Sequence, residues 1–233
     1  MPRINFHLQL AELKDKLLAM AALSQQALEF SVEGYLERDM ALCEHVLEIE
    51  EAINTAETVV DEMAYELLAK EQPMAIDLRF ILSVIKINGD LERIGDQAAN
   101  IAQRALALKD EPVIELPVDI QEMGERAGVM IRTSIQALLE ADARRADSVL
   151  SMDDAVDERN KAVQAELMEV MQQKPEVSTQ AITAILIARN LERSADHATN
   201  IAEIVYYIVQ GSQLKEERPK ADITSREALP LPL

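Results

Sequence analysis

Residues 91–105 read LERIGDQAANIAQRA, and residues 191–205 read LERSADHATNIAEIV, so that eight of fifteen positions are identical at an offset of 100. Upstream the match continues at an offset of 103, where Asp39 aligns with Asp142 and Val46 with Val149. A repeat of about 100 residues is far longer than the unit of a solenoid. The sequence therefore predicts a duplicated domain.

Each copy shows the same three helical segments. Apolar residues recur at alternating spacings of four and three in the third segment of each copy, as expected for the seam of an antiparallel bundle. Asp39 and Asp142 are typical helix N-caps, and Pro73 ends a helix. The spacing predicts helices over about 8–36, 40–70, 76–108, 118–140, 142–172 and 178–210. The predicted fold is all-α: two tandem antiparallel three-helix bundles at 1–110 and 116–211, then a mobile C-terminal tail at 212–233.

Composition agrees with long helices and limits the function. The 233 residues include six Gly, three Phe, four Tyr and no Trp, so the core must be aliphatic. A formal net charge of −19 repels phosphate backbones, which argues against a nucleic-acid partner. One cysteine excludes an internal disulfide, and no uncharged run approaches the roughly 20 residues of a membrane span. We expect a cytoplasmic protein.

The residue patterns of common enzymes are missing from the sequence. We find no phosphate-binding glycine loop, no nucleophile elbow and no dinucleotide fingerprint. No residue is assigned a catalytic or cofactor-binding role, and we expect a protein that is not an enzyme. His197 corresponds to Gln97 in the first copy, which favours a surface position.

Acidic stripes recur in both copies. Carboxylates spaced by four residues share one face of a helix, and a helical wheel places the stripes of the third helices nearly opposite the apolar seam. A neighbouring helix could bring its own stripe alongside, so that four carboxylates converge. Oxygen ligands favour hard cations, namely Mg²⁺, Mn²⁺, Ca²⁺ or ferric iron. A solvated face paired with Arg93 and Arg193 is the alternative. The candidate metal ligands are Glu50, Asn54, Glu92, Asp96 and Asn100 in the first half, and Asp153, Asp157, Glu192, Asp196, Asn200 and Glu203 in the second.

The repeated segments LERIGDQAANIA and ARNLERSADHATNIAE resemble the paired signature of the PhoU family of bacterial phosphate-transport regulators. The resemblance covers about residues 8–210. It implies two three-helix bundles in a cytoplasmic, often dimeric, non-enzymatic protein, located at the inner face of the membrane only through its partners. It also implies binding to the ATPase of the phosphate ABC transporter and to the membrane histidine kinase of the phosphate regulon. When phosphate is plentiful, that binding holds down both uptake and the starvation response.

The resemblance further implies metal clusters on motifs of Glu or Asp followed four residues later by Asp. These motifs map onto Glu92/Asp96, Glu192/Asp196 and Asp153/Asp157. The fourth, Glu50/Asn54, departs because asparagine stands where aspartate is expected, and Gln103 stands where the second copy has Glu203. We therefore predict tighter cation binding in the second half. A carboxylate-cluster metalloenzyme acting on a phosphate substrate is the alternative function.

Overall fold

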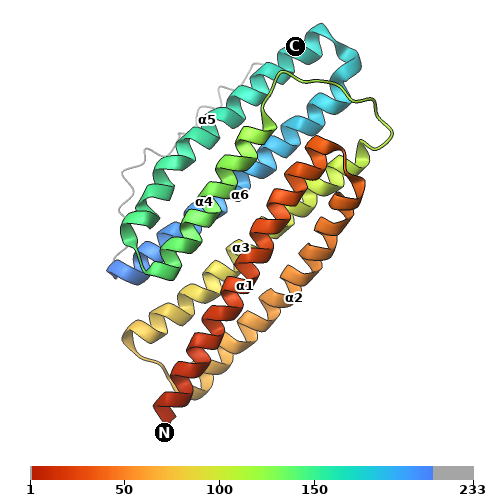
Figure 1. The fold of residues 1–233 in the computed structure, drawn as a ribbon. Coiled ribbons are helices and arrows are strands. Elements are labelled where there is room, and N and C mark those ends of the chain that lie inside the picture. The colour runs from red at the N-terminus through yellow and green to blue at the C-terminus, as the bar shows by residue number, and fades with distance from the viewer. Residues whose placement is uncertain (1, 212–233) are drawn as a thin grey trace, which may run out of the picture.

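A computed structural model describes residues 2–211, which form six long helices. The helices are α1 (Pro2–Glu37), α2 (Met40–Glu71), α3 (Ala75–Ala107), α4 (Ile120–Glu140), α5 (Ala143–Gln173) and α6 (Ser178–Gln210), and a short 3-10 turn, η1 (Pro175–Val177), precedes α6. No strand occurs within residues 2–211, and the predicted two three-helix bundles are confirmed (Figure 1). The predicted tail lies outside the described residues.

Local signals set the starts of α2 and α5. The Asp39 carboxylate accepts a hydrogen bond from the Leu42 N–H at 3.0 Å, and Asp142 accepts from the N–H groups of Arg144 and Arg145, so both predicted N-caps are confirmed. The largest difference is at α1, which begins at Pro2 rather than near residue 8. Proline suits the first turn of a helix, and the buried side chain of Phe6 anchors this added length to the core.

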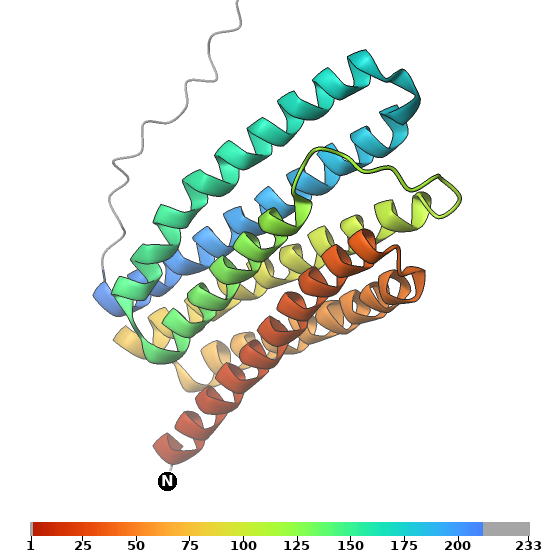
Figure 2. The same ribbon diagram turned by 45° about the horizontal axis from the view of Figure 1, so that its top comes forward.

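Helices α3 and α6 lie at the centre of the molecule. Helix α3 packs against α1, α2 and α6, and α6 packs against α3, α4 and α5, while α2 and α5 form the outer flanks (Figure 2). The two central helices are antiparallel, since Arg79 near the start of α3 stacks on Tyr207 near the end of α6. The offset of 100 therefore exchanges α3 and α6, which gives the molecule an approximate two-fold symmetry.

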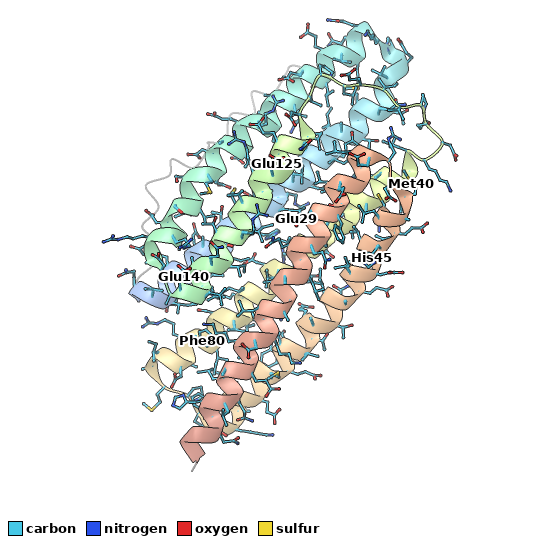
Figure 3. The ribbon with its side chains drawn as sticks, viewed as in Figure 1. Glu29, Met40, His45, Phe80, Glu125 and Glu140 are labelled. Carbon is cyan, nitrogen blue, oxygen red and sulfur yellow. The ribbon has the colours of Figure 1, made fainter. Side chains whose placement is uncertain are left out.

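The two halves also meet through α1 and α4. Arg132 Nη1 of α4 lies 2.6 Å from Glu29 Oε1 of α1, and Figure 3 shows Glu29 on the side of α1 that faces α4. Gly124 of α4 allows this approach, because a Cβ there would come within 2.9 Å of Val32 Cγ1. Among the helices of residues 2–211, none has both the length and the apolar character needed to cross a bilayer.

Candidate metal centre

Three carboxylates meet where α5 packs against α6. One oxygen from each of Asp153, Asp157 and Asp196 lies within 4.8 Å of the others, which is close enough for a shared metal ion. Asp153 and Asp157 are one helical turn apart on α5, and Asp196 reaches them from α6. The structure thus brings together three of the predicted ligands from two helices.

The position of Asp153 is unusual for a charged group. It follows the buried face of α5 between Val149 and Val156, and its side chain is only 6% exposed. The Thr199 hydroxyl of α6 donates a hydrogen bond to Asp153 Oδ1 at 3.2 Å. Burying a carboxylate costs free energy unless it is hydrogen-bonded or paired with a cation. Its burial beside two more carboxylates therefore favours a cation ligand.

The electrostatics of the cluster agree with that reading. Burial raises the pKa of the Glu192 carboxyl, and the charges of Asp196 and Asp157 raise it further. Burial likewise raises the pKa of Asp196, with the charges of Asp153 and Asp157 adding to it, although His197 and Arg193 oppose the shift. Like charges held together raise one another's pKa. A bound cation would reverse this effect.

A cavity of about 350 Å³ opens beside the cluster. Asp153 and Asp196 line it together with Asn200 and Glu203, both predicted ligands. His197 and Arg193 also line it, although the sequence favoured a surface position for His197. The His197 side chain is 12% exposed, because α6 is covered by α3 on that side. Its partner there is Asp90 of α3, a residue that sequence reasoning missed.

The first half gathers its acidic residues less tightly. Burial raises the pKa of Glu92, and the charges of Asp96, Glu57 and Glu50 raise it further. The Asn54 amide donates a hydrogen bond to Glu50 Oε1 at 2.6 Å, so these two candidate ligands bind each other. Within the described residues, no three carboxylates of this half come as close as the trio in the second half. Asn100 is exposed on α3, and Glu57, which corresponds to Asn160 in the second copy, was not among the predicted ligands.

The stripes lie closer to neighbouring helices than the helical wheel predicted. Glu92, Asp96 and Glu192 are half-buried, and Asp196 remains exposed. A wheel assigns one core face to each helix, but α3 and α6 are central and pack on more than one side. The face opposite the seam therefore meets α2 in the first half and α5 in the second.

Comparisons with known proteins agree over both halves. A model of the PhoU domain matches residues 17–105 and 120–205. A phosphate-specific transport system accessory protein PhoU homologue of Pseudomonas putida is 37% identical over 214 residues, covering 91% of this chain and 83% of that protein. The homologue of Caulobacter vibrioides is 34% identical over 219 residues, covering 94% and 95% of the two chains.

Solved structures show the same fold. The crystal structure of PhoU from Pseudomonas aeruginosa has a TM-score of 0.85 and 36% identity, and the match covers 89% of this chain and all of that one. The regulatory protein PhoU from Streptococcus pneumoniae has a TM-score of 0.83 and 27% identity, covering 91% of this chain and all of the other.

Proposed function

Since the chain belongs to the PhoU family, we propose that it is an accessory protein that regulates phosphate transport. It acts in the cytoplasm by binding the ATPase of the phosphate ABC transporter and the membrane histidine kinase of the phosphate regulon when phosphate is plentiful. Uptake and the starvation response are both held down as a result. The observation that carries this proposal is the likeness, across both repeats, to proteins named as accessory to phosphate-specific transport.

The surface of the chain suits binding to basic partner surfaces. With a net charge of −19, exposed carboxylates cover the long helices, and charge complementarity speeds and orients association. The outer flanks formed by α2 and α5 offer extended faces for this purpose (Figure 2). We propose that the chain also forms a homodimer, as the resemblance implies.

We further propose that the second half holds a hard cation. The donor set supports it: Asp153, Asp157 and Asp196 supply converging oxygens, and Asn200 and Glu203 line the cavity beside them. Glu192, one helical turn before Asp196 on α6, is close enough for the charges of Asp196 and Asp157 to raise its pKa. Such oxygen-rich sites suit Mg²⁺, Mn²⁺, Ca²⁺ or ferric iron. The weaker gathering in the first half supports a lower affinity there. The cation would offset much of the negative charge of the cluster and join α5 to α6.

A bound cation would also change the affinity of the site for phosphate. Without one, the cluster repels an anion; with one, much of the negative charge is offset, and the cation itself would offer a coordination position to a phosphate oxygen. We therefore propose that any phosphate sensing passes through bound metal. Calorimetric titration of inorganic phosphate into metal-free and Mn²⁺-loaded protein tests this idea. Binding to the metal-free protein would contradict it.

The direct test of the adaptor function uses purified partners. The chain is titrated against the transporter ATPase and, separately, against the cytoplasmic part of the kinase, in Mn²⁺ and in chelator. We expect saturable binding to both, weakened by salt. If the chain binds neither the ATPase nor the kinase, with Mn²⁺ or with chelator, the proposal is refuted. Hydrolysis of a generic phosphate ester in the presence of Mn²⁺, lost in Asp153→Asn, would instead favour the metalloenzyme.

A further inference from the structure

The joint between the two repeats, where α3 packs against α6, contains a hydrogen-bonded cluster of Asp90, His197 and Asn200, which we call the hub. Asp90 of α3 accepts two hydrogen bonds at one oxygen, Oδ1: from His197 Nδ1 at 2.9 Å and from Asn200 Nδ2 at 3.2 Å, both on α6. The side chains of His197 and Asp90 are 12% and 14% exposed. A carboxylate of the first repeat therefore holds two residues that line the cavity of the second repeat.

The chemistry of the hub sets the orientation of both partners. An ionised carboxylate can only accept, so both nitrogens must donate. His197 therefore carries a proton on Nδ1 in either charge state. The amide of Asn200 turns its nitrogen towards Asp90, so that contact does not use its oxygen. That oxygen belongs to a residue on the cavity wall beside Asp153 and Asp196.

The two-fold symmetry of the molecule provides a natural comparison. It maps Asp90 onto Asn190 and His197 onto Gln97, so the symmetry-related position has no carboxylate. There, Gln97 Oε1 and Asn190 Nδ2 are buried, and neither has a hydrogen-bond partner among the described residues. The hub is thus a property of one side of the joint, the side that carries the tighter acidic cluster.

We propose that Asp90 is a positioning residue for the cation site of the second repeat, acting through Asn200 and His197. This inference rests on the proposed cation binding. Residues that orient metal ligands from behind often change metal affinity substantially. Because linkage is reciprocal, a cation bound in the second repeat also strengthens the contact between the two repeats. The site is therefore coupled to the joint, and its counterpart in the first repeat is not.

The test is Mn²⁺ titration by calorimetry in an Asp96→Ala background, which removes binding by the first half. We expect Asp90→Asn to weaken Mn²⁺ binding about tenfold. Two controls separate positioning from charge and from packing. Asp154→Asn removes an equal charge from an exposed position next to Asp153, and Asn190→Ala disturbs the symmetry-related side of the joint. Neither control should change the affinity more than about twofold.

Two further measurements address how Asp90 acts. In a double-mutant cycle, Asp90→Asn and Asn200→Ala should not be additive, because one acts through the other. In metal-free protein, long-range ¹H–¹⁵N spectra should show the His197 proton on Nδ1, and Asp90→Ala, which removes the acceptor, should shift it towards Nε2. An unchanged tautomer in Asp90→Ala would show that Asp90 does not orient His197.

The outcomes separate the two proposals. If the Asp96→Ala protein does not bind Mn²⁺, the proposed cation site is wrong and the inference falls with it. If that protein binds Mn²⁺ and Asp90→Asn binds equally well, or no worse than Asp154→Asn, the positioning role is refuted while the cation site stands. Transplanting the hub by Asn190→Asp and Gln97→His, with Asp96 intact and Asp196→Ala, should strengthen binding in the first half.

Discussion

Replacing Asp196 by asparagine should stabilise the metal-free protein and destabilise the metal-loaded one. Asp196 faces Asp153 and Asp157, with one oxygen of each within 4.8 Å of the others. Two unit charges at that distance repel by about 0.9 kcal/mol in the dielectric of water. Asp196 is the most exposed of the three carboxylates but is partly desolvated, so the water value is a lower limit for the repulsion. After the opposing charge of Arg193 is allowed for, the two repulsions leave a gain of about 1 kcal/mol for the substitution.

A bound cation should reverse the order. A ligand at a hundred times its dissociation constant stabilises the folded state by about 2.7 kcal/mol. The wild-type protein gains this term, whereas Asp196→Asn loses most of it. In saturating Mn²⁺ the wild type should therefore be the more stable by somewhat under 2 kcal/mol. The two unfolding curves cross as cation is added.

Urea unfolding followed by far-ultraviolet circular dichroism measures both effects. In chelator, the Asp196→Asn midpoint should lie about 0.4 M above the wild type. Asp154→Asn, which changes an exposed neighbour of Asp153, should move the midpoint little in either condition. A lower midpoint for Asp196→Asn in chelator would mean that Asp196 makes a net favourable contact, and the repulsion argument would be wrong.

Three further predictions concern pH, packing and the first half. The raised pKa values of Glu192 and Asp196 mean that the folded state binds protons more tightly than the unfolded state. In metal-free protein the free energy of unfolding should therefore rise as pH is lowered from about 7 towards 4.5. Urea midpoints that fall over this range would contradict this prediction. Gly95→Ala brings a Cβ within 2.9 Å of Ile53 Cδ1 and should lower the free energy of unfolding by about 1–2 kcal/mol. Gly89→Ala, with open space around it, should instead raise the free energy of unfolding by under about 1 kcal/mol in the same urea assay. Asn54→Asp restores the missing carboxylate and should raise the Mn²⁺ affinity of the first half in an Asp196→Ala background, measured by calorimetry; an unchanged affinity would show that Glu50 and Asn54 lie outside any site.

Helix positions were predictable because their signals are local. Asp39 and Asp142 cap helices through hydrogen bonds from N–H groups within three residues. Pro73 ends a helix because its ring and missing N–H do not fit a helix interior. The apolar seam also follows from spacing alone: Ile87, Leu91 and Ile94 are all buried. These features need no knowledge of what packs against the helix.

The details of the candidate site depend on partners distant in sequence. Spacing placed Asp153 and Asp157 on one face, but only the packing of α5 on α6 brings them to Asp196. A helical wheel could not show that His197 lies beneath α3, since the covering residue, Asp90, is 107 positions away. A usable signal did exist: Asp90 and His197 both differ from their copies, Asn190 and Gln97, and they differ together.

Differences between the two copies are therefore the more informative part of the duplication. Packing alone accounts for identities such as Leu91 and Leu191, because both central helices are buried in the same way. Packing does not account for aspartate at 157 where the first copy has Asn54, or for glutamate at 203 where it has Gln103. Asp157 joins Asp153 and Asp196 in the close trio, and Glu203 lines the cavity beside them. Asp90 holds His197 and Asn200 at the wall of the same cavity. The first copy has one extra carboxylate of its own, Glu57, where the second has Asn160. Since each added negative charge destabilises an unliganded cluster, aspartate at 157 and glutamate at 203 argue for a cation beside Asp196.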